Sequence, residues 1–178
     1  FSILVMVPIL VLGIYSYQQS KENTERQIRS TMESNLTRLT SELDTRFQRE
    51  ASTVRFLAYN LTFRNALENS GSSAMMMAQV MNASVEPTFW YFIAGDAYVK
   101  GMEVYSTKVR DKIGNFLLPV DDTVSQQAWY QQALDSYATH WTYDGVEICA
   151  NRAILDTNSS SEVIAVLRMF CYPASLLD

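Results

Sequence analysis

Apolar residues recur every three or four positions between residues 21 and 67, and neither proline nor glycine interrupts this stretch. That spacing is typical of a helix with one apolar face, and charged residues occupy the opposite face. The apolar positions are Ile28, Met32, Leu36, Leu39, Leu43, Phe47, Val54, Leu57 and Leu61. A lone helix cannot bury such a stripe, so we predict a stalk helix over residues 18–69 that pairs with a second copy below and packs on a domain above.

Residues 1–17 are almost entirely apolar and carry no charge. A membrane-spanning helix needs about 20 such residues. We therefore interpret this stretch as a transmembrane helix cut at its N-terminal end, with Tyr15 and Tyr17 at the membrane interface. A secretory signal peptide is the alternative, but no small-residue cleavage site follows the apolar run.

Beyond the stalk, the hydrophobic pattern predicts one domain over residues 70–178. A break at residues 69–73 is followed by short helices at 73–81 and 86–93, and a further helix is expected to begin within 172–178. Alternating apolar positions indicate strands at 100–107, 114–120, 140–143, 147–155 and 162–171, with a helix at 125–134. The expected fold class is α+β, with the long helix and short helices packed on a PAS-like antiparallel sheet.

Composition narrows the range of functions. The chain has 178 residues, 48% of them hydrophobic, and a net charge of -5, which fits a globular domain without the basic face of a nucleic-acid-binding protein. One histidine, His140, and two cysteines are too few for an ordinary zinc site. Phosphate-binding, hydrolase and calcium-loop motifs are missing from the sequence. We expect no catalytic residues, cofactor or metal within this chain.

The two cysteines lie in strand-like runs on either side of residues 156–161. A hairpin centred near residue 160 places Cys149 opposite Cys171, at a separation that a disulfide spans in an oxidising compartment. Two buried thiols in the same core are the alternative.

The order of these elements resembles a known family, the extracellular Cache (PAS-like) sensor region of YesM-type bacterial sensor histidine kinases. The resemblance covers nearly the whole chain, and its most specific feature is the helix with Trp129 and Tyr130. It rests further on the anchor with its long helix, Gly101-Met-Glu-Val-Tyr105, the Trp141 strand, Arg152-Ala-Ile-Leu-Asp156 and Val163-Ile-Ala-Val-Leu167.

The resemblance implies a homodimeric receptor in the bacterial cytoplasmic membrane, with the residues after about position 18 outside the cell. The ATP-dependent histidine kinase and its response regulator would lie beyond this sequence. A ligand pocket is implied between the sheet and the helix of Trp129. Its candidate residues are Tyr105, Trp129, Tyr130, Trp141, Tyr143, Arg152 and Asp156.

The ligand chemistry follows from a departure from the family pattern. Amino-acid-sensing members carry Arg-x-Trp-Tyr, whereas this chain has Gln127-Ala-Trp-Tyr130. Because a neutral amide replaces the cation that grips a carboxylate, we expect a small neutral ligand such as a sugar. A solute-binding protein is the alternative partner.

Three other functions remain open at this level. The chain could be the sensor of another receptor class, such as a chemoreceptor or a diguanylate cyclase, or a membrane-anchored surface interaction protein. A tethered hydrolase would use carboxylates among Asp96, Asp121, Asp122 and Asp156.

Overall fold

The computed structural model describes residues 2–69, 74–159 and 162–173, in two compact units, Phe1–Thr45 and Arg46–Asp178. The predicted break at residues 70–73 and most of the helix expected within 172–178 lie outside the described residues, as do two residues, 160–161, of the turn between the cysteine strands. The same holds for the side chains of residues 1–11, most of the predicted membrane segment.

The first unit is part of helix α1 (Ser2–Ala58). Side chains from Leu12 to Glu42 are exposed, and three ion pairs one turn apart link charged residues along its surface. No helix among the described residues combines the length and apolar character that a membrane crossing requires.

The predicted stalk helix ends earlier than the periodicity indicates. Helix α1 stops at Ala58, and a separate helix, α2 (Leu61–Glu68), begins after Asn60. The Asn60 side chain accepts a hydrogen bond from Phe63 N at 3.0 Å, which satisfies a free amide in the first turn of α2. The apolar stripe continues across this break because both helices pack on the same core.

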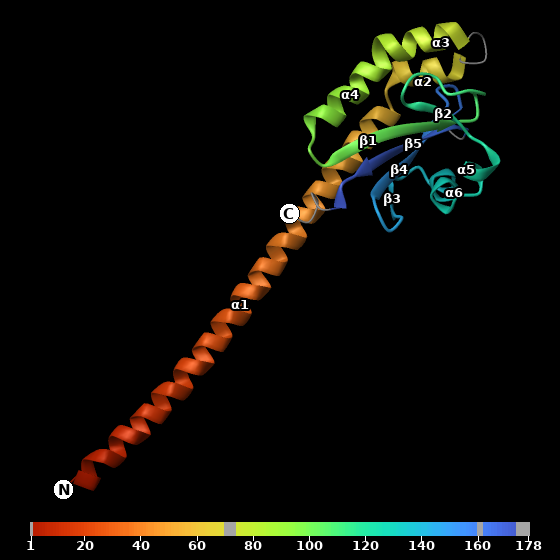
Figure 1. Ribbon diagram of the computed structural model, residues 1–178. Coiled ribbons are helices and arrows are strands. Elements are labelled where there is room, and N and C mark those ends of the chain that lie inside the picture. The colour runs from red at the N-terminus through yellow and green to blue at the C-terminus, as the bar shows by residue number, and fades with distance from the viewer. Residues whose placement is uncertain (1, 70–73, 160–161, 174–178) are drawn as a thin grey trace. The chain divides into compact units, whose positions relative to one another are not determined.

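Five strands form one sheet in the second unit, in the order β2-β1-β5-β4-β3 (Figure 1). They are β1 (Val99–Ser106), β2 (Leu117–Pro119), β3 (His140–Tyr143), β4 (Ile148–Leu155) and β5 (Val163–Cys171). The α+β class is confirmed, and four of the five strands agree with the alternating pattern to within one residue.

The prediction of a wholly antiparallel sheet is wrong at β2, which runs parallel to β1. Residues 107–116 form a connection long enough to carry the chain back before it pairs, with Leu117 opposite Val104. Gly114 takes a positive φ of 61° in this connection, a conformation that glycine adopts without steric cost. The sheet is therefore mixed.

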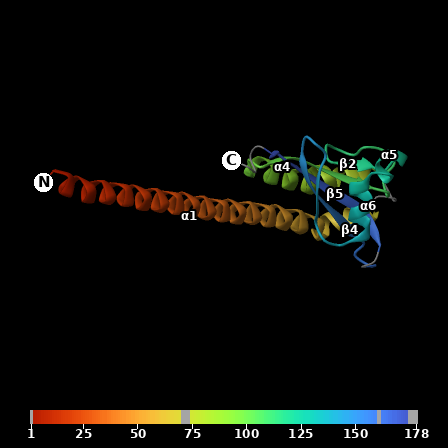
Figure 2. The same ribbon diagram turned by 90° about the horizontal axis from the view of Figure 1, so that it is seen from below.

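Helices cover both faces of the sheet. Helix α3 (Ala74–Val80) continues through a π-helical turn, η2 (Met81–Val85), into α4 (Glu86–Gly95), so the two helices expected from sequence join. The helix expected at residues 125–134 is instead two short ones, α5 (Asp122–Ser125) and α6 (Ala128–Asp135). Figures 1 and 2 show α6 beside β4, where it packs on β3, β4 and β5.

The main core lies between one face of the sheet and helices α1, α2, α4 and the η2 turn, and we call this face the helical face. Phe89 is at its centre, with ring centroids 5.5 Å from Phe63 and 5.1 Å from Phe116. A smaller cluster, formed by Tyr130, Ala133 and Val166, lies on the opposite face under α6. We call this second side the α6 face.

Candidate functional site on the α6 face

The structure separates the predicted ligand residues onto two faces of the sheet. Trp141 packs edge-on against Phe47 of α1, with ring centroids 4.7 Å apart. Arg152 donates to Thr139 Oγ1 at 3.1 Å, and its guanidinium lies 5.4 Å from the Tyr59 ring centroid. Both therefore belong to the helical face, where they help to attach α1 to the sheet.

Three of the predicted residues do come together, on the α6 face. The rings of Tyr105 and Trp129 are 5.2 Å apart, and Tyr130 is buried in the same cluster. The Tyr105 hydroxyl donates to the Glu103 carboxylate, and burial together with this carboxylate raises the pKa of Tyr105. These three aromatic residues form one wall of the candidate site.

The two remaining predicted residues lie in turns. Tyr143 is exposed and its hydroxyl donates to the carbonyl oxygen of Gly145 at 2.8 Å. The Asp156 carboxylate accepts from the amides of Asn158 and Ser159, at 2.7 and 3.0 Å. Both interactions stabilise local turns.

A row of polar residues that we did not predict crosses the α6 face from strand to strand. His140 of β3 pairs with Asn151 of β4, Asn151 with Arg168 of β5, and Arg168 with Glu103 of β1. Because side chains alternate along a strand, all four point away from the helical face. We call His140, Asn151, Arg168 and Glu103 the polar row.

Three members of the polar row carry a buried atom without a hydrogen-bond partner among the described residues. These atoms are His140 Nε2, Asn151 Oδ1 and Arg168 Nε. The Asn151 amide donates to Thr142 Oγ1 at 2.9 Å, which leaves its oxygen as a free acceptor. Buried polar groups are nearly always paired, so such a row points to a missing partner molecule or water.

Arg168 is held by aromatic rings. Its guanidinium carbon lies 4.4 Å from the Trp129 ring centroid and 5.0 Å from that of Phe170. Its Nη2 atom also lies 3.6 Å from an Asp144 carboxylate oxygen. The cation is thereby fixed beneath α6, and its Nε–H is buried without a hydrogen-bond partner among the described residues.

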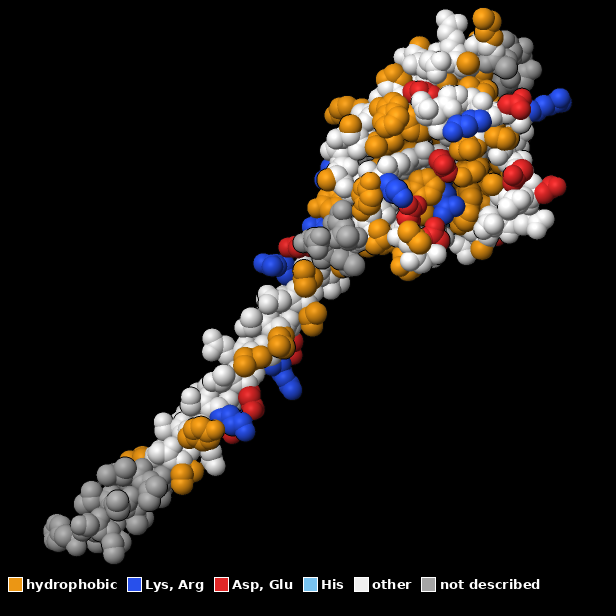
Figure 3. All heavy atoms as spheres, in the orientation of Figure 1, with side chains coloured by type: hydrophobic (Ala, Val, Ile, Leu, Met, Phe, Trp, Pro, Cys, Tyr) orange, Lys and Arg blue, Asp and Glu red, His pale blue; other side chains and the backbone are white. Residues whose placement is uncertain are grey.

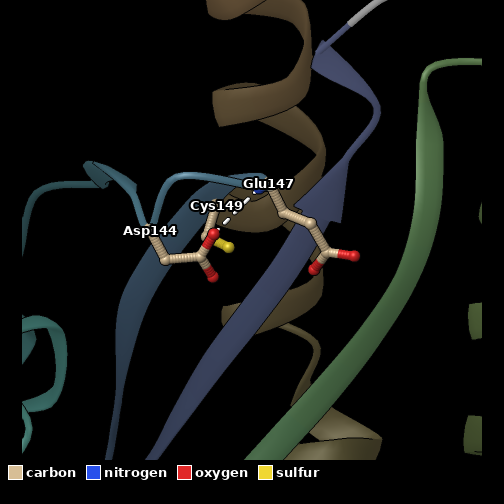
Figure 4. A group of neighbouring side chains, drawn as sticks. All are labelled: Asp144, Glu147 and Cys149. Atoms are coloured by element: carbon tan, nitrogen blue, oxygen red, sulfur yellow. Dashed lines mark hydrogen bonds between the residues drawn. The ribbon is translucent and has the colours of Figure 1, made fainter.

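An acidic cluster lies at one end of the polar row. Asp144, Glu147 and Cys149 place their ligand atoms within 4.8 Å of one another, with the Asp144 carboxylate next to the Cys149 sulfur (Figure 4). Arg168 donates to Cys149 Sγ at 3.4 Å, and Lys100 pairs with Glu147. Burial raises the pKa of the Cys149 thiol, and the neighbouring Arg168 only partly offsets this.

These contacts explain the cluster without a metal ion. Two cations, Arg168 and Lys100, balance its two carboxylates. Backbone amides of Glu147 and Val146 lower the pKa of Asp144, so this carboxylate is ionised and available to Arg168.

A shallow cavity of about 300 Å³ opens beside the polar row. Its lining residues are Lys100, Gly101, Met102, Glu103, Glu147 and Phe170. Figure 3 shows this side of the molecule, where charged side chains of both signs surround hydrophobic ones. The site thus combines apolar rings with balanced charge.

The carboxylates considered for a hydrolase have structural contacts. Asp121 caps α5 by accepting from Val124 N at 2.7 Å, and Asp156 holds its turn as described above. Asp96 pairs with Arg49 at 2.8 Å. Asp122 is exposed in the first turn of α5.

The predicted disulfide is not formed. The register places Cys149 opposite Phe170 and Cys171 opposite Ile148, so the two side chains point to opposite faces and both cysteines are free. The prediction placed the hairpin centre too far along the chain, and a register shift between Ile154 and Leu155 also changes the pairing. A slip of one residue reverses the face of every side chain.

Gln127, on which the expected ligand chemistry depended, is the exposed N-cap of α6. The cation on this face comes from β5 instead, as Arg168. A sequence signal for it exists, because Arg168 is the one charged residue within the apolar run of residues 163–171.

The sequence matches no known protein-family model, and it has no detectable similarity to the curated proteins with which it was compared.

Proposed function

We propose that the α6 face binds a small, neutral, hydroxyl-rich ligand such as a sugar. The observation that supports this most directly is that three buried polar atoms of the polar row have no hydrogen-bond partner among the described residues, and that one of them belongs to Arg168 next to Trp129. Arg168 Nε can donate and Asn151 Oδ1 can accept, and a hydroxyl group does both. The Trp129 ring offers a flat apolar surface of the kind that suits the face of a sugar ring.

The charges of the site favour a neutral ligand. Arg168 has Asp144 at 3.6 Å and lies opposite Glu103 across the β1–β5 pair. A carboxylate ligand would compete with two carboxylates for one guanidinium. A neutral ligand avoids this competition.

We further propose that the chain is the extracellular Cache-type sensing module of a bacterial sensor histidine kinase. The order of elements that resembles this family supports the proposal, as does α1, an unbroken helix from Ser2 whose last turns enter the core through Val54 and Leu57. In this scheme the exposed stripe of α1 pairs two copies, and a membrane anchor precedes it. The kinase and its response regulator transmit the signal inside the cell.

Coupling would run across the sheet. A ligand on the α6 face contacts β3 and β4, and on their other side Trp141 and Arg152 contact residues of α1 and its end. A ligand that prefers one packing of these strands thereby biases the position of the helix.

Replacing Asn151 tests the binding site. We expect Asn151→Ala to weaken binding of the matching sugar about 5- to 13-fold, because a buried hydrogen bond is worth about 1–1.5 kcal/mol. Thermal shift with a panel of neutral sugars and amino acids identifies the ligand, and calorimetry measures its affinity. Asn115→Ala, which removes the same side chain at an exposed position, serves as the control.

Two results would contradict the proposal. Stabilisation by amino acids but not by sugars would overturn the neutral ligand. Equal affinity of the Asn151→Ala and Asn115→Ala proteins for the ligand would show that the ligand does not bind on the α6 face. If no small molecule stabilises the chain while a solute-binding protein does, direct sugar binding is wrong.

A further inference from the structure

Glu50 is a fully buried carboxyl group on α1, at the opposite side of the sheet from the proposed ligand site. Its residue is 1% exposed, and it is the one acidic residue that is buried among those the structure describes. Its Oε1 atom is buried and has no hydrogen-bond partner among these residues. An ionised carboxylate without a partner is costly in such a place.

The neighbours of Glu50 do not neutralise it. Asp96, which follows the last residue of α4, accepts from Tyr98 N at 3.0 Å through Oδ1 and pairs with Arg49 Nη2 at 2.8 Å through Oδ2. Arg49, the residue before Glu50 in the chain, is therefore already bound to the competing carboxylate. Cys171 of β5 faces the same group and, with its pKa raised to about 12 by burial and by Glu50, stays uncharged.

Burial raises the pKa of Glu50 to about 7, and the charge of Asp96 adds to this effect while Arg49 opposes it. Glu50 and Asp96 line the same cavity, and a protonated Glu50 carboxyl is a donor that the Asp96 carboxylate can accept. Glu50 is thus able to gain and lose a proton near neutral pH.

We propose that Glu50 and Asp96 form a proton-sensing site, a second input to the module that acts directly on α1. With Glu50 protonated, its O–H donates to the Asp96 carboxylate, which holds α1 against the junction of α4 and β1. With Glu50 ionised, two carboxylates repel each other and the junction loosens. A cavity of about 200 Å³, lined by Arg49, Glu50, Thr53, Tyr91, Phe92 and Asp96 among others, gives water a route to the ionised group.

The sign of the pH effect follows from linkage. In the unfolded chain Glu50 titrates near its ordinary pKa of 4.5, so between pH 4.5 and 7 the folded state binds more protons. Stability is therefore lost as the pH rises through this window. The difference of about 2.5 pH units corresponds to about a 300-fold change in the folding equilibrium.

The test is urea unfolding of the full chain at pH 5 and pH 8, in the wild-type protein and in Glu50→Gln. We expect the two proteins to be similar at pH 5, and Glu50→Gln to favour the folded state by up to about 300-fold over wild type at pH 8. Glu33 is an exposed glutamate on the same helix, so Glu33→Gln should have the same stability as wild type at pH 5 and at pH 8. Equal pH dependence of wild type and Glu50→Gln would overturn the proposal.

A second measurement needs no variant. In the wild-type chain labelled with ¹³C at glutamate carboxyl groups, one resonance should titrate near pH 7. Amide hydrogen exchange, corrected for its intrinsic pH dependence, should show that residues 46–58 lose protection across the same pH range. Titration of every glutamate between pH 4 and 5, or unchanged protection of α1, would each contradict the site. These outcomes leave sugar binding at Asn151 unaffected, because the two sites lie on opposite faces of the sheet.

Discussion

Arg168 determines much of the character of the α6 face. Its guanidinium lies over the rings of Trp129 and Phe170 and contacts Asp144, and one of its N–H groups is buried without a hydrogen-bond partner among the residues that the structure describes. A lysine could not replace it, because a lysine has neither the planar group that stacks on two rings nor the Nε–H that remains available. The side chain thus combines a structural role with a free donor.

The residues of this site differ in how well a sequence reveals them. Trp129 and Tyr105 were predicted, because aromatic residues at an expected helix and strand are visible in the pattern. Asn151 and Arg168 were missed, because their importance depends on which of two faces they occupy and on the strands beside them. Gln127 was predicted to face the ligand because it occupies the place of the arginine in the Arg-x-Trp-Tyr pattern. In the structure it is the N-cap residue of α6 and its side chain is exposed to solvent.

Both cysteines should behave as buried thiols. We expect a thiol reagent such as dithionitrobenzoate to react negligibly with the folded protein and to titrate two thiols once the chain is unfolded without reductant. The reasons are full burial of both side chains, their raised pKa values and the register that separates them. Fewer than two thiols in the unfolded chain would show that a disulfide had formed.

At the scale of single elements, helix ends are set by side chains that the apolar pattern does not register. The stripe of apolar positions runs smoothly across residues 58–61, yet the chain starts a new helix there because Asn60 supplies an N-cap. Likewise, β2 looks like any short strand in the sequence, and only the return of residues 107–116 makes it parallel to β1. Local pattern predicts an element, whereas its direction depends on the connection before it.

Removal of the Asn60 cap should destabilise the second unit. We expect Asn60→Ala to lower the free energy of unfolding by about 1 kcal/mol, because the Phe63 amide loses its acceptor. Urea unfolding followed by circular dichroism measures the change. Asn60→Asp, which keeps an acceptor oxygen, should remain close to wild type, and a loss as large as that of alanine would show that the cap is not responsible.

At the scale of the whole molecule, the first unit leaves an apolar stripe uncovered. Ile28, Met32, Leu36 and Leu39 are each about half exposed or more, and their spacing of four, four and three residues suits a two-stranded coiled coil. Coverage by a second copy of the chain agrees with the homodimer that we propose.

A charge in this stripe should separate the copies. We expect Leu36→Glu to weaken dimerisation at least about 10-fold, since it places like charges at a buried seam. Sedimentation equilibrium gives the dissociation constant. Thr37→Glu adds the same charge about 100° around the helix and should leave the dimer intact. Equal association of both variants, or a monomeric wild type, would argue against pairing through α1.

The central position of β5 has a consequence for how the chain is made. Strands β1 and β2 lie on one side of β5, and β4 and β3 lie on the other, yet β5 comes last of these five along the chain. A ribosome therefore releases both halves of the sheet before the strand that joins them, and each half waits with an unpaired edge. Pairing across such sequence distances is slow. Newly made chains are consequently most exposed to aggregation, and most dependent on chaperones, until residues 163–171 pair with both halves of the sheet.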